Sequence, residues 1–178
     1  MVSFFIGGNK MVWERIARLK SEKQNAIEWA LLKEFTLHPV AEAQVARIVK
    51  VAGISRGAFY NYFKDLPDAY RYIYKIAIRN IHQNLHTKDL ANATDFVQQT
   101  REFVKGAENS DYYQLMQMHY LHNESYVSRL VLPIEANSEL QWARITLVHD
   151  TLRGALVQPE TAEKRFQQLA WALKQLEG

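Results

Sequence analysis

Four side chains suited to nucleic-acid contact lie between residues 56 and 64. Arg56 can donate two hydrogen bonds to a guanine edge, and Asn61 can pair in a similar bidentate way with adenine. The hydroxyl of Tyr60 and the ammonium of Lys64 can bind phosphate oxygens. Gly57 lacks a side chain, which allows its backbone to come close to DNA or to a neighbouring helix. This composition suits a helix face that binds DNA.

Two short helices joined by a tight turn would position these side chains. The first helix, residues 43–52, has a buried stripe of Val45, Ile48, Val49 and Ala52. Gly53 suits the left-handed residue that ends a helix, and Ser55 offers a side-chain cap to the next one. That second helix is predicted over residues 56–63, with Phe59 and Phe63 on its buried side. The arrangement is a helix-turn-helix, whose second helix lies in the major groove.

Helical periodicity extends over the rest of the chain, and strand signals are nearly absent. A long helix is predicted from Ser21, which has capping-box spacing to Gln24, and it ends before Pro39. The amphipathic segment 11–20 extends this helix as a basic arm. Pro67 suits the first turn of a fourth helix. The later predicted helices cover residues 67–85, 92–107, 110–130, 134–157 and 160–177. The fold class is therefore all-α.

The stretch VARIVKVAGISRGAFYNYFKDLPDAY resembles the DNA-binding signature of TetR/AcrR-type bacterial transcription regulators. That signature is a helix with Ile-Ala-x-x-Ala-Gly-Val-Ser, followed by x-Gly-x-Phe/Leu-Tyr-x-x-Phe. The match runs without a gap from Phe35 to Phe63 and extends over about residues 21–70. The resemblance implies an N-terminal three-helix helix-turn-helix domain, residues 11–66, and a C-terminal helical ligand-binding and dimerisation domain, residues 67–178.

The resemblance also implies roles for single residues. Those facing base edges would be Arg56, Gly57, Ala58 and Asn61. Those at or near phosphates would be Ser55, Tyr60, Tyr62 and Lys64. Gln44 stands where the family usually has a threonine that touches the DNA backbone.

The start of the helix at 43–52 departs from the family pattern. Pro39 stands where the family usually has glycine, and Ala43 with Gln44 replaces a frequent pair of threonines. Loss of a hydroxyl cap costs a helix about 1 kcal/mol. Glu42 offers its carboxylate to the N-terminal end of the helix instead.

A third departure keeps two functional hypotheses open. Leu66 stands where a phosphate-binding lysine is common, and Lys64 offers a replacement two residues earlier. The first hypothesis is a sequence-specific, ligand-responsive repressor that acts as a homodimer on a pseudo-palindromic operator. The second is a protein-interaction or coactivator module that keeps the fold but reads its operator weakly.

Basic residues are concentrated in the first third of the chain. Residues 1–66 carry ten Lys or Arg and six Asp or Glu, whereas residues 67–178 carry twelve and thirteen. The imbalance indicates an anionic partner for the first third, such as double-stranded DNA.

The segment DYYQLMQMHYLHNESY, residues 111–126, suits either a plain core or an effector pocket. Methionine adapts its shape, and tyrosine and histidine supply polar groups in an apolar wall. The resemblance implies that this region, with the fourth helix, encloses a small molecule. The candidate pocket residues are Tyr70, Tyr74, Ile78, Tyr112, Met116 and His119.

The last two predicted helices carry apolar stripes that suit a four-helix interface between two copies of the chain. The resemblance implies a homodimer of this kind. The first stripe is Leu140, Ala143, Arg144, Leu147, Val148, Thr151, Leu152 and Ala155, and the second is Phe166, Leu169, Ala170, Leu173 and Leu176.

The composition argues against several other kinds of site. The chain has no cysteine, which excludes disulfides and thiolate metal sites and favours a reducing, cytoplasmic location. His82 with His86 and His119 with His122 have helical ligand spacing but no carboxylate-rich motif, so we expect no metal. No catalytic motif is present, so we expect neither an enzyme nor a cofactor. No apolar run is long enough to span a membrane, and no basic residue precedes the apolar patch near the N-terminus, so we expect neither a membrane partner nor a signal peptide.

Overall fold

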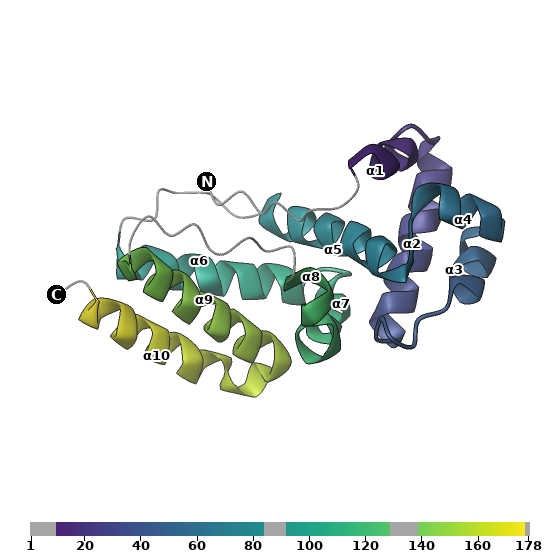
Figure 1. The fold of residues 1–178 in the computed structure, drawn as a ribbon. Helices are drawn as coiled ribbons and strands as arrows, with labels where there is room; N and C mark the ends of the chain where they lie inside the picture. The colour runs from purple at the N-terminus through teal and green to yellow at the C-terminus, as the bar shows by residue number, and fades with distance from the viewer. Residues whose placement is uncertain (1–9, 84–91, 129–138, 177–178) are drawn as a thin grey trace. The chain divides into compact units, whose positions relative to one another are not determined.

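The computed structural model describes residues 10–83, 92–128 and 139–176, and every regular element within them is helical (Figure 1). The all-α prediction is confirmed. The helices are α1 (Lys10–Ala17), α2 (Ser21–Leu37), α3 (Val45–Ala52), α4 (Arg56–Tyr62), α5 (Leu66–Gln83), α6 (Ala93–Glu108), α7 (Tyr113–Met118), α8 (Glu124–Ser128), α9 (Glu139–Val157) and α10 (Ala162–Gln175).

The chain forms two compact units. Unit 1 comprises Met1–Ile78 and Leu121–Leu132, and unit 2 comprises Arg79–Tyr120 and Pro133–Gly178. The division between the units passes through α5, because the first part of this helix packs with the N-terminal helices. The assignment of functional domains to residues 11–66 and 67–178 stays a prediction.

Aromatic and branched side chains build the core of unit 1. Phe35 on α2 meets Tyr70 on α5 edge-on, with ring centroids 5.2 Å apart. Phe63 lies 5.2 Å from Phe59 and 5.5 Å from Tyr72 by the same measure. Burial of such large apolar side chains is the main force that holds the short helices α3 and α4 in place.

The turn between α3 and α4 has the predicted geometry. Gly53 is left-handed, with φ 64° and ψ 35°, and its N–H donates to the carbonyl of Val49. Ser55 is extended, and its Oγ accepts the N–H of Ala58 at 3.1 Å. Helix α3 therefore ends, and α4 begins, as the sequence predicts.

The basic arm ahead of α2 is a separate helix, which corrects the predicted extension. Helix α1 ends at Ala17, and the N–H of Leu19 turns back to the carbonyl of Ile16 at 2.9 Å. Ile16 is fully buried, and Trp13 meets Tyr72 edge-on at 5.7 Å. The chain bends because this bend lets the apolar side of α1 pack into unit 1.

The predicted capping box at Ser21 is wrong. Lys20 is the N-cap of α2 and makes no side-chain cap, and Ser21 is already helical. The amide of Gln24 donates instead to the carboxylate of Glu28 at 2.8 Å, one turn along the same helix. Pairing at this spacing competes with the backward reach that a capping box requires.

The predicted helix over 110–130 is interrupted. Helix α7 gives way at His119 to a π-helical turn that runs to Asn123, and α8 follows. Such a turn inserts an extra residue into a helix and changes which residues share a face. The side-chain pattern read at regular helical spacing is therefore out of phase beyond His119.

Helices α6, α9 and α10 lie side by side in unit 2 (Figure 1). Their shared core contains Ala93, Leu169 and Leu173, with Leu147, Val148 and several neighbours packed against it. The sequence predicts that most of these residues on α9 and α10 belong to a dimer interface. In the structure Leu147, Val148, Leu169, Leu173 and Leu176 of these stripes pack in the core shared with α6. The homodimer through the last two helices stays a prediction.

Candidate nucleic-acid interface

Helix α4 has a buried side and an exposed side. Phe59 and Phe63 are completely buried. Arg56, Asn61 and Tyr60 are exposed, with 48% of the surface of Tyr60 accessible. The core therefore fixes the helix, and the three polar side chains stay available for a partner.

Arg56 and Tyr60 form one joined surface. They are one helical turn apart, and Arg56 Nη2 donates to the Tyr60 hydroxyl at 3.3 Å. The Arg56 guanidinium also lies 5.5 Å from the centre of the Tyr60 ring. Stacking and hydrogen bonding hold the guanidinium near a defined position, which reduces the entropy lost when it binds a base or a phosphate.

The small residues at the start of α4 leave space on its exposed side. A methyl group at Gly57 would contact, among the described residues, Ser55 Oγ alone, at 3.9 Å. Packing against α3 therefore does not require glycine here. Gly57 and Ser55 are exposed and Ala58 is half-buried, so their backbone is open to close approach.

The end of α4 and the start of α5 position Lys64. Its side chain is exposed, and its backbone N–H donates to the carboxylate of Asp68 at 3.0 Å. The N–H of Asp68 in turn donates to Asp65 Oδ1 at 2.7 Å. These two bonds fix the backbone, so that the exposed side chain of Lys64 can reach a phosphate. Tyr62 is half-buried beside them.

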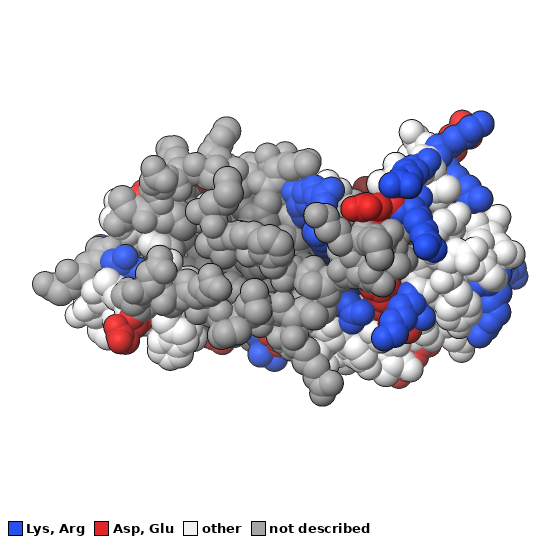
Figure 2. Space-filling model, turned by 45° about the horizontal axis from the view of Figure 1, so that its top comes forward, with Lys and Arg blue, Asp and Glu red and all other residues white. Residues whose placement is uncertain are grey.

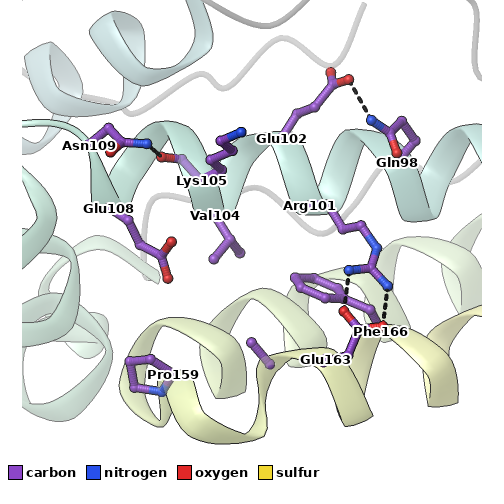
Figure 3. Close-up of a pocket in the computed structure, with 11 residues that line it drawn as sticks. Gln98, Arg101, Glu102, Val104, Lys105, Glu108, Asn109, Pro159, Glu163 and Phe166 are labelled. Atoms are coloured by element: carbon purple, nitrogen blue, oxygen red, sulfur yellow. Dashed lines mark hydrogen bonds and ion pairs between the residues drawn. The ribbon is translucent and has the colours of Figure 1, made fainter.

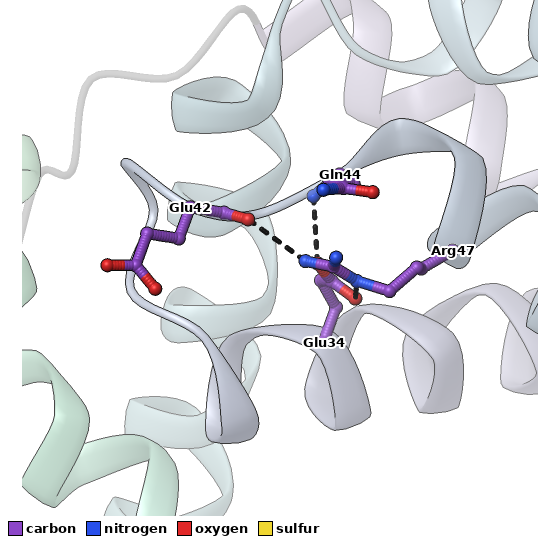
Figure 4. A network of polar contacts seen from close by, with 4 residues as sticks. All are labelled: Glu34, Glu42, Gln44 and Arg47. Carbon is purple, nitrogen blue, oxygen red and sulfur yellow. Dashed lines mark hydrogen bonds and ion pairs between the residues drawn. The ribbon is translucent and has the colours of Figure 1, made fainter.

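Helix α3 begins at an ion pair that the sequence reading missed. Gln44 is exposed, and its backbone N–H donates to Glu34 Oε1 at 2.8 Å. Arg47 Nη2 donates to the same oxygen at 2.6 Å and to the carbonyl of Glu42 at 2.9 Å (Figure 4). The carboxylate at the N-terminal end of α3 is thus that of Glu34 rather than that of Glu42. An acidic residue within the apolar stripe of α2 was the available signal.

Because some acidic side chains are buried, the surface of unit 1 is more basic than its amino-acid composition suggests. Between residues 13 and 66, eight Lys or Arg side chains are exposed, against three Asp or Glu. Figure 2 shows Lys and Arg side chains in blue over this unit. Glu34 is only 4% exposed, and its hydrogen bond to Arg47 raises the pKa of that guanidinium. A surface with this balance attracts a polyanion.

Residues 30–65 match the family model described as bacterial regulatory proteins, tetR family. The matched stretch includes α3, the turn at Gly53 and all of α4. The helix-turn-helix of this chain is thus similar to that of tetR-family regulatory proteins.

The fold is also similar to that of a solved tetR-family protein. This is the crystal structure of a TetR family transcriptional regulator from Chloroflexus aurantiacus J-10-FL. The TM-score is 0.55 at 14% sequence identity, over 92% of this chain and 95% of that one. Likeness at this identity concerns the fold. No curated protein matches the sequence.

The predicted effector-pocket residues fall in both units. Tyr70 and Tyr74, in unit 1, are buried and stacked, with ring centroids 6.0 Å apart. Met116 and His119, in unit 2, are also buried. Ile78 and Tyr112 are half-buried. Tyr70 belongs to the core of unit 1 through its contact with Phe35, and the pocket stays a prediction.

Unit 2 contains an open groove elsewhere, with a volume of about 760 Å³ (Figure 3). It lies between α6 and the start of α10, and none of the six predicted pocket residues lines it. Arg101 crosses it and pairs with Glu163 through two hydrogen bonds of 2.5 and 2.8 Å. The guanidinium also lies 4.4 Å from the centre of the Phe166 ring. Five of its eleven lining residues are charged, and two of these, Arg101 and Glu163, pair with each other.

No group of three or more His, Cys, Asp or Glu side chains among the described residues is placed to hold a metal ion. None of the described helices is long and apolar enough to cross a membrane.

Proposed function

We propose that this chain is a tetR-family, ligand-responsive repressor that binds a pseudo-palindromic operator as a homodimer. The observation that carries the proposal is the division of α4, with Phe59 and Phe63 buried and Arg56, Tyr60 and Asn61 exposed. A helix held in this way can enter the major groove with its polar side against the bases. Such a function on bacterial DNA belongs in the cytoplasm.

Exposed aromatic residues on the last two helices support the homodimer. Trp142 on α9 is 56% exposed, and Trp171 on α10 is 67% exposed. Exposed tryptophans of this size are costly in water and are enriched at the centres of interfaces. A second copy packed on α9 and α10 would cover them. Two helix-turn-helix units about 34–36 Å apart would then read two half-sites.

The ligand response is proposed for the region of α7 in unit 2. Met116 and His119 combine a polar group with apolar volume there, a composition typical of small-molecule sites. A ligand that binds one arrangement of the dimer better than another would shift the population of DNA-competent molecules.

Selection from a pool of random duplexes with the full-length chain tests the DNA-binding part. We expect enrichment of a sequence with two-fold symmetry. Arg56→Ala should then lose about 1–3 kcal/mol of the binding free energy that discriminates between bases at one position of the operator. Tyr60→Ala should weaken binding to all sequences, because its hydroxyl is assigned to phosphate. Lys105→Ala, a change at an exposed position on α6, is the control. Unchanged operator binding by the Arg56→Ala/Tyr60→Ala double variant would overturn the proposal.

A protein-interaction module with weakened operator reading is the second candidate. Gln44 in place of a hydroxyl residue and Leu66 in place of a lysine favour it. The acceptor that Glu34 offers to the N–H of Gln44 weakens the first of these reasons, because α3 is anchored without the hydroxyl. Failure of the selection to enrich any duplex would favour this candidate.

A further inference from the structure

The N-terminal end of α3 receives its hydrogen-bond acceptor from another helix. The first N–H groups of a helix lack acceptors within the helix, and a Ser, Thr, Asp or Asn side chain at the N-cap usually supplies one. Gln44, the N-cap of α3, makes no such bond with its side chain. Glu34 Oε1, from α2, accepts the N–H of Gln44 at 2.8 Å. A carboxylate from α2 thus does what a glutamate inside α3 does in a capping box.

Arg47 joins this carboxylate to the chain on both sides of Gln44. Arg47 Nε lies 3.0 Å from each oxygen of Glu34, and Nη2 lies 2.6 Å from Oε1. The same Nη2 donates to the carbonyl of Glu42 at 2.9 Å. One carboxylate and one guanidinium therefore connect α2, the loop at 42–44 and the first turn of α3 (Figure 4).

Burial makes this geometry specific. Glu34 is 4% exposed, so its oxygens need hydrogen-bond donors fixed around them. Three donors meet them: the N–H of Gln44 and the Nε and Nη2 groups of Arg47. A rotation or slide of α3 along α2 would separate these donors from the buried carboxylate. The pair therefore selects one position for the start of α3.

The position of α3 also determines the position of α4. Only Gly53, Ile54 and Ser55 separate the two helices, and each of these junction residues has a fixed backbone conformation or hydrogen bond. The place of α4 relative to α2 thus depends on where α3 begins. We propose that Glu34 and Arg47 are positioning residues for operator recognition, setting where Gln44 and α4 meet DNA. The inference rests on the proposed DNA-binding function.

Paired apolar substitutions separate positioning from stability. The Glu34→Met/Arg47→Met double variant keeps the net charge of the chain and replaces the ion pair by two flexible apolar side chains. Replacement of a buried ion pair in this way is often neutral or stabilising. It offers no acceptor to the N–H of Gln44. Glu34→Gln is the conservative variant, because it keeps one oxygen that can accept this N–H.

The measurement is the ratio of two dissociation constants, one for an unrelated duplex and one for the selected operator of equal length. Full-length variants are compared at a temperature where circular dichroism shows each to be folded. We expect the ratio to fall at least tenfold in the double variant, with its melting temperature near that of the parent. In the Glu34→Gln variant this ratio should fall by less than in the double variant. Amide exchange at Gln44 should also speed up at least tenfold in the double variant, while Phe63 N–H exchange stays the same.

Three outcomes are distinguishable. A double variant that keeps the operator preference of the parent would overturn the positioning role alone. Loss of preference with Gln44 exchange unchanged would also overturn it, since the start of α3 would not have moved. A parent chain that prefers no duplex would overturn the proposed function, and the inference with it.

Discussion

The side-chain oxygen of Asn123 accepts the backbone N–H of Val40 at 2.9 Å, although 83 residues separate the two. Asn123 ends the π-helical turn and is fully buried, and Val40 lies in the loop between α2 and α3. The bond accounts in part for the inclusion of Leu121–Leu132 in unit 1. A late segment of the chain is thus part of the support of the DNA-binding helices.

Replacement of Asn123 by alanine should destabilise unit 1. The buried N–H of Val40 would lose its acceptor, which costs about 1–3 kcal/mol. Urea unfolding followed by circular dichroism measures the change. Ser125→Ala, at an exposed position two residues on, is the matched control and should leave the free energy of unfolding unchanged. Equal unfolding midpoints for the two variants would contradict this prediction.

Replacement of Ile16 by alanine should also destabilise the protein, although Ile16 lies outside the stretch that matches the tetR-family model. Ile16 is fully buried, and truncation of such a side chain costs about 2–5 kcal/mol. Glu14→Ala alters an exposed residue of the same helix and is the control. If α1 were a loose arm, both variants would unfold at the same urea concentration.

Replacement of Lys64 by alanine should weaken DNA binding without altering sequence preference. A lysine that contacts a phosphate releases about one counterion when it binds. The slope of the logarithm of the binding constant against the logarithm of salt concentration should therefore flatten by about one unit. Lys105→Ala, at an exposed position on α6, should keep the parental slope. A changed base preference with the slope intact would mean that Lys64 reads bases instead.

Replacement of Trp171 by glutamate should shift the proposed homodimer towards monomer. An aromatic residue at the centre of an interface is worth about 2 kcal/mol or more, and two-fold symmetry applies the change to both subunits. Sedimentation equilibrium measures the dissociation constant. Trp29→Glu changes a tryptophan on α2 that is 60% exposed, against 67% for Trp171, and is the matched control. Dissociation by Trp29→Glu alone would place the interface on unit 1.

His119 should make the stability of the protein depend on pH. Burial lowers its pKa to about 4, from the usual value of 6.5. Between these values the unfolded chain binds a proton that the folded chain does not. The free energy of unfolding is therefore highest above about pH 6.5 and falls towards pH 4, by up to about 3 kcal/mol.

Thermal unfolding at a series of pH values from 4 to 7 measures this dependence. His119→Gln, which does not titrate in this range, should flatten the curve. His122→Gln, at an exposed position, should leave the parental curve unchanged. An identical curve for parent and His119→Gln would contradict the assignment.

The sequence by itself determined the helix-turn-helix and its exposed face. Gly53, Ser55 and the pair Phe59 and Phe63 act through bonds and contacts only a few residues long, so their types and spacing were sufficient. The later helices were also predictable, because helical periodicity is a local property.

Only the tertiary structure decided which distant residues hold the helix-turn-helix in place. The acceptor for Gln44 comes from ten residues earlier in the chain, and that for Val40 from 83 residues later. The bend after α1 and the cover of α6 over the last two helices likewise depend on which apolar surfaces meet. Local patterns carry no information about such pairings, because burial and hydrogen bonding are settled only when distant segments pack together.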